Sequence, residues 1–408
     1  MRHAIFFLER REQLRLPERP GGAPSSFQAA SGAGRTEWQE GGVHHHFWEG
    51  REVPGEPALT SALQALCESP GIDRSLAPAL LELLTGLEAT GATALFQEVL
   101  QDVLVGVPGS LRADRRRVAW LELRAPGGAL LELPFASATH VLADATRLQA
   151  HAEETVARGR ARAQAAPCPS GALTIVLAPG SDAGVLFHEL CGHPLEGDVV
   201  LRQASYLATR RGERVAPEFV TVSDDPTAGT GGVAYSLDDE GTPARSADLL
   251  HGGRVAEPLM HRTSAAALGL EANGHGRRLD FRHLALPRMS HTVVRPHQGS
   301  LGSLCAGVAD GLLVTYLTPR FIHLMSGDFC FHIPEARRIQ DGVVGAHVKP
   351  GLLRGNALAA LAGIQAVGAD VATFHGLKGC GKLDQGGLPV SFALPSVRLG
   401  PLHVEPLS

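Results

Sequence analysis

The stretch HELCGHPLEGD, residues 188 to 198, constrains the fold more than any other part of the chain. An apolar run, ALTIVLAP, comes shortly before it and is typical of a short buried strand. A helix is then predicted to begin at Ser181 or Asp182 and to end near Pro194, because proline is poorly tolerated inside a helix. The sequence therefore predicts a buried strand followed by a buried helix, and charged residues in such a helix need a reason to be there.

Two histidines in that helix are the first candidates for chemistry. His188 and His193 are five residues apart, which places them about 140° apart around a regular helix. Either a π-type bulge absorbs the extra residue or the helix unwinds before His193, and the adjacent glycine and proline permit both. Zinc catalysis needs three protein ligands, an open position for water and a base. Glu196 and Asp198 could each orient an imidazole from behind.

A third ligand has to come from elsewhere, and the best candidate is Cys380 in HGLKGCGKLDQGG. Glycines flank this cysteine, which lets the backbone come close to a metal or a substrate. Lys378 and Lys382 stand two residues away on either side, and nearby cations favour a thiolate. His375 is the rival ligand, and the competing interpretation of Cys380 is a small buried apolar residue.

Composition narrows the classes of protein to consider. A chain of 408 residues is long enough for two domains with cores of their own. The net charge of −5 provides no basic surface, so we expect no nucleic-acid binding. No apolar stretch has the length of a membrane span, and no signal-peptide pattern is present. Six cysteines without paired spacing favour a reducing cytoplasm.

The pattern of elements predicts an α+β fold with two domains. Residues 1–167 are predicted to form an N-terminal α/β domain, and the loop APCPSG to mark its end. Residues 168–408 are predicted to form a mostly antiparallel β domain that carries the metal-site helix.

Individual elements can be predicted as well. The first fifty-odd residues are expected to form short strands and loops. Helices are predicted over residues 144 to 165 and over SLAPALLELLTGLEA, with Ser75 as the cap of the latter. An Asp-Gly pair at 341 and 342 predicts a tight turn between two antiparallel strands.

Several blocks, in the same order along the chain, resemble the TldD/PmbA family of zinc metallopeptidases, specifically its catalytic TldD-type subunit. The segment around the two histidines is similar to the H-E-x-x-x-H stretch of that family, and GCGKLDQGG stands where the family has its metal-binding cysteine. The resemblance extends from about residue 140 to 390. The blocks that carry it are APGSDAGVLFHELCGHPLEGD, VSDDPTAGTGGVAYSLDDEGTPAR, LPRMSHT, MSGDFCFHIPEARRIQDG and GCGKLDQGG.

The resemblance implies both a site and a function. Zinc would be held by His188, His193 and Cys380, and Glu189 would serve as general base and acid, so that zinc and Glu189 activate a water. The substrates would be unfolded peptides or leader segments, bound as an added strand at a sheet edge. The family also implies a dimer, either of two copies or with a PmbA-type subunit, in which the N-terminal domain contributes to dimerisation and walls the cavity.

Other polar residues are weaker candidates. Arg288 could clamp a substrate carboxylate or carbonyl, or form a structural ion pair. His291, where the family usually has asparagine, and Lys382 are candidates for contact with the ligands or the substrate, whereas residues 238 to 240 are predicted to brace a turn. Two alternatives to a zinc metallopeptidase are considered. A non-catalytic PmbA-type subunit would lack the H-E-x-x-x-H residues, and a metal-stabilised peptide-binding protein would not need Glu189.

Overall fold

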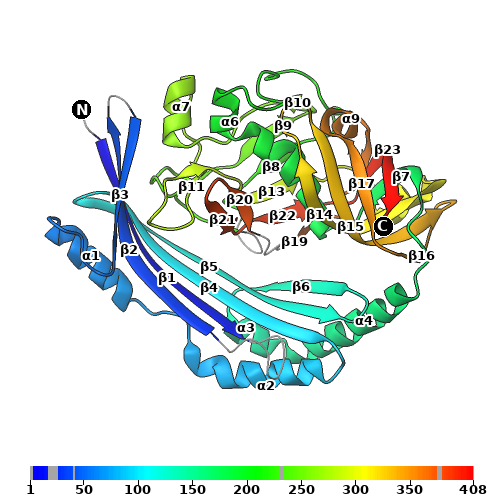
Figure 1. The fold of residues 1–408 in the computed structure, drawn as a ribbon, viewed down its shortest axis with the longest axis horizontal. Helices are drawn as coiled ribbons and strands as arrows, with labels where there is room; N and C mark the ends of the chain where they lie inside the picture. The colour runs from blue at the N-terminus through cyan, green and yellow to red at the C-terminus, as the bar shows by residue number, and fades with distance from the viewer. Residues whose placement is uncertain (1–2, 17–25, 40–41, 229–232, 375–378, 408) are drawn as a thin grey trace.

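The protein is a mixed α+β structure with mostly antiparallel sheets, which confirms the predicted fold class. Figure 1 shows a long curved sheet from the N-terminal part of the chain lying against a more compact, β-rich remainder. None of the described helices combines the length and the apolar character that crossing a membrane requires. This computed structural model describes residues 3–16, 26–39, 42–228, 233–374 and 379–407.

The N-terminal sheet has six strands in the order β3-β2-β1-β4-β5-β6, and every neighbouring pair is antiparallel. Its helices lie on the outer side of the sheet, and the β-rich remainder faces the other side (Figure 1). Both faces of the sheet are therefore covered. The elements are β1 (His3–Leu16), β2 (Ser26–Gln39), β3 (Gly42–Glu49), α1 (Pro57–Glu68), α2 (Ala77–Glu88), β4 (Thr93–Val107), β5 (Ser110–Ala125), β6 (Ala129–Phe135), α3 (Ala138–Ala143) and α4 (Ala145–Ala163).

The remainder is built around strands that close on themselves. The pairing runs β14-β7-β23-β17-β15, and β15 pairs again with β14, so the five strands form a closed ring with β16 and β18 attached. Closure removes the exposed edges that an open sheet would have. The strands are β7 (Gly171–Leu177), β14 (Asp310–Ile322), β15 (Asp328–Gln340), β16 (Val343–Val348), β17 (Gly351–Asn356), β18 (Ile364–Val367) and β23 (Val397–Pro406).

A second sheet lies beside this ring, in the order β10-β9-β8-β13-β22-β19, and two short hairpins, β11-β12 and β20-β21, complete the β structure. These strands are β8 (Val222–Asp224), β9 (Ala247–His251), β10 (Arg254–Val255), β11 (Gly276–Arg277), β12 (Leu286–Pro287), β13 (His291–Val294), β19 (Ala372–Phe374), β20 (Cys380–Lys382), β21 (Gln385–Leu388) and β22 (Ser391–Leu394). The short helices are α6 (Gly197–Leu201), α7 (Arg262–Leu268), α8 (Leu301–Ala306) and α9 (Ala357–Ala362).

Two local predictions for the N-terminal part are wrong. The first strands are long, with 14 residues each in β1 and β2, because each strand pairs with neighbours along most of its length. Ser75 does not cap α2. The side chain of Asp73 accepts a hydrogen bond from the Ser75 amide and caps a short 3₁₀ turn, Arg74–Leu76, that precedes the helix.

Two other local predictions are confirmed. Helix α4 occupies the predicted 144–165 segment. The Asp-Gly pair joins β15 to β16, and both Asp341 (φ 47°) and Gly342 (φ 79°) have the positive φ angles that such a turn requires.

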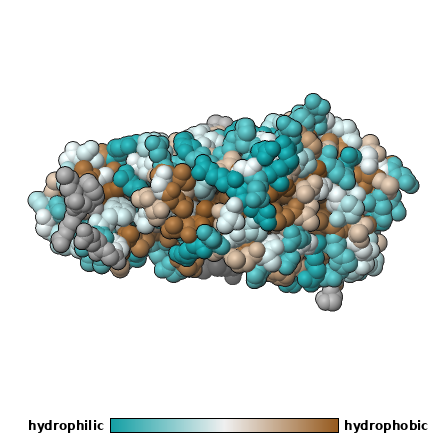
Figure 2. Space-filling model, turned by 90° about the horizontal axis from the view of Figure 1, so that it is seen from above, coloured by the Kyte–Doolittle hydropathy of each residue, from teal (hydrophilic) through white to brown (hydrophobic). Residues whose placement is uncertain are grey.

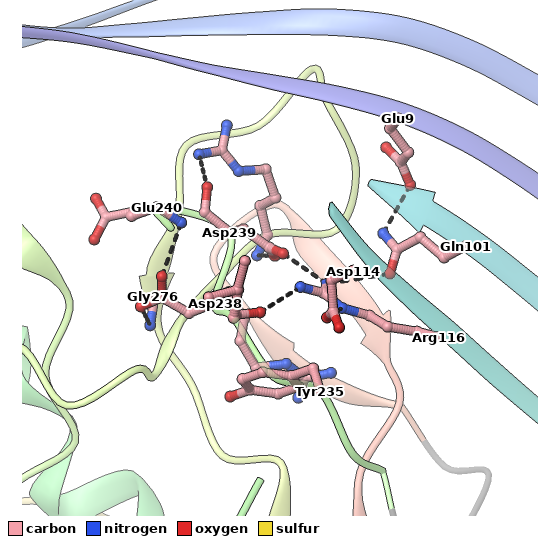
Figure 3. Close-up of polar contacts among 12 residues, drawn as sticks. Glu9, Gln101, Asp114, Arg116, Tyr235, Asp238, Asp239, Glu240 and Gly276 are labelled. Carbon is pink, nitrogen blue, oxygen red and sulfur yellow. Dashed lines mark hydrogen bonds and ion pairs between the residues drawn. The ribbon is translucent and has the colours of Figure 1, made fainter. Parts of the chain in front are cut away.

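A buried polar junction joins the N-terminal sheet to the β-rich remainder (Figure 3). Arg116 on β5 forms an ion pair with Asp239, at 2.6 Å from Nη1 to Oδ1, and a second with Asp114 on its own strand. Asp239 also accepts from the Arg278 amide at 2.7 Å. The adjacent Asp238 accepts from amides two and four residues ahead, so this segment braces a turn as predicted. The junction therefore ties strand β5 to the loop that carries Asp238 and Asp239.

Candidate metal centre

The helical segment that carries the two histidines changes its winding three times. The Ser181 side chain caps its start by accepting from the Ala183 amide, and a 3₁₀ turn (η2, Asp182–Gly184) and one α turn (α5, Val185–Phe187) follow. Residues His188–Gly192 (η3) form a π-helix, and His193–Leu195 (η4) a final 3₁₀ turn. The π-helix is one of the two solutions predicted for the five-residue spacing, and it absorbs the additional residue.

Neighbouring residues hold the π turn closely. A Cβ added at Gly192 would lie 2.7 Å from Cγ of Met289, so glycine permits this close approach. The buried hydroxyl of Tyr206 donates to the Leu190 carbonyl at 2.5 Å. Cys191 is fully buried in the core, where burial raises the pKa of its thiol. It therefore acts as a small apolar residue here.

The fold brings His188, His193 and Cys380 together. One ligand atom from each side chain lies within 4.8 Å of the others. The two imidazole centroids are 5.1 Å apart with their planes at 86°, and Sγ of Cys380 is 3.4 Å from Nε2 of His193. His375, the rival for the third ligand, lies outside the described residues. These three donors come from two segments almost two hundred residues apart in the sequence.

Arg288 holds the hairpin that carries Cys380. Its guanidinium is fully buried, and it donates from Nη2 to the Cys380 carbonyl at 2.6 Å and from Nη1 to the Gln385 carbonyl at 3.3 Å. Both acceptors belong to the β20-β21 hairpin. The arginine therefore braces the backbone behind the cysteine, whereas a contact with substrate stays a prediction.

The charges at the cluster favour the ligand form of the cysteine. Burial alone would raise the pKa of the Cys380 thiol, but the imidazoles of His193 and His188 outweigh it and hold that pKa well below 9. Burial lowers the pKa of His193, and Cys380, Glu196 and Glu189 together raise it well above its usual 6.5. These opposite shifts favour a Cys380 thiolate paired with the imidazolium of His193.

Behind His193 lies a chain of charged groups. Its Nδ1 is 3.4 Å from Oε2 of Glu196, and Nζ of Lys382 is 3.0 Å from the same oxygen. Lys382 also donates to Asp198. Burial raises the pKa of Glu196, but His193 and Lys382 lower it further than burial raises it, so this carboxylate is ionised. Glu196 thus contacts His193 directly, whereas Asp198 is joined to it only through Lys382, and their roles stay predictions.

Glu189 lies at the open side of the cluster. Its Oε2 is 3.9 Å from Nε2 of His193, and 17% of its side chain is exposed. Cys380 and His188, by contrast, are almost completely buried. A carboxylate in this position can reach a water or a substrate that approaches the three donors, which a general base must be able to do.

The residues behind His188 were missed by sequence reasoning. Oγ1 of Thr292 lies 3.4 Å from Nδ1 of His188 and donates to Oδ2 of Asp224 at 3.3 Å. The neighbouring His291 was singled out instead, but it is buried and its Nδ1 lies 2.7 Å from Oγ of Ser391, while burial lowers its pKa. Strand alternation was the available signal, because consecutive residues on β13 point to opposite faces.

Two histidines, a cysteine and an adjacent carboxylate make this a candidate hydrolytic metal centre, and comparison with known proteins identifies its family. Residues 170–405 match the family model described as the PmbA/TldA metallopeptidase C-terminal domain, which is more than half of the chain. The chain therefore belongs to the PmbA/TldA, or TldD/PmbA, metallopeptidase family.

Curated relatives carry matching names. A "Metalloprotease" of Methanothermobacter thermautotrophicus is 36% identical over 236 residues, which is 58% of this chain and 51% of that protein. A "Metalloprotease TldD homolog" of Buchnera aphidicola subsp. Schizaphis graminum is 31% identical over 236 residues, or 58% of this chain and 48% of that one. The chain thus spans about half the length of the curated relatives it matches.

Solved structures share the whole fold. TldE from Thermococcus kodakarensis superposes with a TM-score of 0.75 at 15% identity, covering 99% of this chain and 96% of that one. A putative modulator of a DNA gyrase from Thermotoga maritima gives 0.77 at 17% identity, with the same coverage of both chains. At this level of identity the likeness concerns the fold alone.

Proposed function

We propose that the chain is a zinc-dependent metallopeptidase of TldD type that hydrolyses unfolded peptides or leader segments. The observation that carries the proposal is the convergence of His188, His193 and Cys380 within 4.8 Å, with Glu189 at the open side. Membership of a metallopeptidase family supports the reaction class.

The donor set fits zinc. Imidazole nitrogens and a thiolate are the ligands that zinc prefers, and three protein donors leave a fourth position open in a catalytic site. The low pKa of the Cys380 thiol and the groups behind both histidines suit these roles. A relative in Saccharolobus solfataricus, 29% identical over 238 residues, is named a zinc metalloprotease TldD homolog. When bound, zinc would polarise the substrate carbonyl and acidify the attacking water.

Within this proposal, Glu189 moves the protons. It takes a proton from the attacking water and returns it to the leaving amine, and the partial exposure of its side chain leaves room for both partners. Glu196, anchored by Lys382, holds the ring of His193 through Nδ1 and directs Nε2 toward Cys380.

Replacing Glu189 by Gln distinguishes a metallopeptidase from a metal-stabilised peptide-binding protein without catalytic activity. We expect Glu189→Gln to retain zinc. Its rate of peptide hydrolysis should fall by about 10²-fold to 10⁴-fold. Glu154→Gln, on an exposed position of α4, serves as the matched control and should hydrolyse normally. Unchanged hydrolysis in Glu189→Gln would contradict the assigned role. No hydrolysis in the wild type despite bound zinc would favour the binding protein or a non-catalytic PmbA-type subunit.

Zinc content tests the ligand set independently. Elemental mass spectrometry should find about one zinc per wild-type chain, because one three-donor cluster occurs among the described residues, and much less in Cys380→Ala. Cys67→Ala, on α1 and packed against the core of the N-terminal sheet, should match the wild type. Full zinc in Cys380→Ala would show that another side chain supplies the third ligand. An absence of zinc from the wild type after reconstitution would refute the proposal.

A sheet edge near the cluster suits an extended peptide. Strand β19 is the last strand of its sheet and pairs with β22, among the described residues. Phe392 of β22 lies against His188, with ring centroids 5.5 Å apart. A peptide added along β19 would lie two strands away from β22 and take up the main-chain hydrogen bonds that an edge strand offers.

The proposal includes a dimer, of two copies or with a PmbA-type subunit, and a place in the cytoplasm. Residues 1–167 would form a domain that contributes to the dimer and walls the cavity, and residues 168–408 the catalytic domain. A hollow of about 850 Å³ between the ends of β1, β4 and β5 and helix α7 favours a partner. Apolar surface also gathers in the middle of the face seen in Figure 2. The free state of all six cysteines suits a reducing compartment.

Light scattering after size exclusion tests the dimer. Leu270 is an exposed apolar residue on this hollow, and a charge there would oppose association. We expect the wild type to form a dimer by itself or with a PmbA-type chain, and Leu270→Glu to weaken it. An exposed position on α1, changed as Glu68→Lys, is the control. A wild-type monomer that hydrolyses peptides without a partner would contradict the assembly.

A further inference from the structure

Thr292 links a candidate metal ligand to a buried carboxylate. It lies on β13 directly opposite Asp224 of the antiparallel strand β8. Its Oγ1 is 3.4 Å from Nδ1 of His188 and 3.3 Å from Oδ2 of Asp224. All three side chains are buried, so water does not compete for these bonds.

The direction of the hydrogen bonds follows from what Asp224 can do. Its Oδ1 accepts from the Ser290 amide at 2.8 Å and from the Ser290 hydroxyl at 2.5 Å, and Nε2 of His275 lies 3.3 Å away. Burial raises the pKa of Asp224, but the His275 and Ser290 contacts lower it to about 2. An ionised carboxylate accepts only, so the Thr292 hydroxyl must donate to it.

This direction decides which nitrogen of His188 carries the proton. A hydroxyl has one hydrogen, and Thr292 gives it to Asp224, so the hydroxyl offers a lone pair to His188. Nδ1 of His188 must then be the N–H that donates to Thr292. In a neutral ring the lone pair is then on Nε2, the nitrogen available to a metal.

We propose that Thr292 and Asp224 are positioning residues that hold His188 as its Nδ1–H tautomer, with Nε2 available as a metal ligand; this inference rests on the proposed zinc function. The arrangement behind His193 is its counterpart, because there Nδ1 faces Glu196 directly. Each histidine thus has a carboxylate behind it, one in contact and one acting through a hydroxyl. Such groups fix ring orientation and raise ligand basicity.

Two substitutions test the direction of the bonds. Thr292→Val removes the hydroxyl at nearly constant volume, and Thr292→Ser keeps it and is the matched control. Asp224→Asn is the sharper test, because its amide can donate to Thr292 and would turn the hydroxyl toward Nδ1 of His188. That turn selects the tautomer with the proton on Nε2, where it blocks the metal.

Zinc affinity and the tautomer are measured on the full chain. Competition with a chromophoric chelator gives the zinc dissociation constant, and nitrogen-15 NMR of the metal-free protein gives the proton position on His188. Thr292→Val should bind zinc about 10- to 100-fold more weakly, Asp224→Asn at least as weakly, and Thr292→Ser within about threefold of wild type. The Nδ1–H population of His188 should fall in the first two variants and persist in Thr292→Ser.

The outcomes separate the two proposals. If Thr292→Val keeps the zinc affinity of the wild type and the same His188 tautomer, the positioning role is overturned and the zinc site stands. If the wild type does not bind zinc, the proposed function fails. The tautomer measurement still tests on its own whether Thr292 and Asp224 position His188. Should Thr292→Val not fold by circular dichroism, Thr292→Ala relieves any steric conflict and gives the same comparison.

Discussion

Tyr206→Phe tests whether the π turn depends on a hydrogen bond from outside the helix. The hydroxyl donates to the Leu190 carbonyl at 2.5 Å and is buried, so the variant removes one buried hydrogen bond at almost constant volume. The expected loss is about 1.5 kcal/mol, within the range for a buried carbonyl that loses a donor. For a chain of 408 residues that unfolds as one unit, that corresponds to a fall in melting temperature of roughly 2 °C.

The pH dependence of the unfolding free energy provides a second test of this hydrogen bond. Burial, followed by the nearby Cys191 and Glu189, raises the pKa of Tyr206 well above 10. A group whose pKa is raised in the folded state contributes all of its stability below its unfolded pKa and loses it as the pH rises. The difference in unfolding free energy between wild type and Tyr206→Phe should therefore be constant below pH 10 and shrink above it.

Tyr235→Phe is the matched control. Its hydroxyl donates to the Gly274 carbonyl at 3.0 Å in another buried region, so both variants lose a comparable hydrogen bond. Differential scanning calorimetry measures the stability of each, and chelator competition measures its affinity for zinc. Zinc binding should weaken in Tyr206→Phe and stay at the wild-type value in Tyr235→Phe. Equal zinc affinity in the two variants would refute the claim that this bond holds the π turn.

Two further predictions concern the polar junction. Arg116→Met leaves Asp239 and Asp114 buried without their cation and should cost about 3–5 kcal/mol in urea unfolding. The control Arg147→Met, which removes an exposed arginine from a pair with Asp144 on the surface, should cost much less, and equal losses would show that burial of the junction contributes nothing special. Burial, and then a neighbouring carboxylate, raises the pKa of Glu240 to about 8 from its ordinary 4.5, so its contribution is complete below pH 4.5 and is lost as the pH rises through 8. The unfolding free energy should fall less steeply over that range in Glu240→Gln, and identical slopes would contradict the assignment.

The two candidate histidine ligands could be predicted because their spacing is visible in the sequence, and Cys380 because of its glycine and lysine neighbours and the family resemblance of GCGKLDQGG. A step of five positions from one histidine to the next, followed by a proline, requires an irregular helix, and the π turn is that irregularity. Thr292 and Asp224 could not be found in this way. They meet because β13 and β8 pair in one particular register, and nothing local in either segment specifies that register.

The N-terminal strands were predicted too short for a related reason. The charged run of β1 reads as a break in an apolar pattern, yet Glu9 and Arg10 are both buried. Glu9 accepts from Gln101 on β4 and from the Phe281 amide of the β-rich part, so partners distant in sequence make a charged strand acceptable in the interior. Sequence periodicity has no access to those partners.

The distance along the chain between His193 and Cys380, 187 residues, has a consequence for biosynthesis. A chain emerging from the ribosome exposes both histidines and Glu189 long before the cysteine has been made. Until the hairpin of Cys380 docks, the three donors are not assembled, and the nascent polypeptide holds an incomplete centre. The order of synthesis therefore delays assembly of the centre until most of the fold that surrounds it exists.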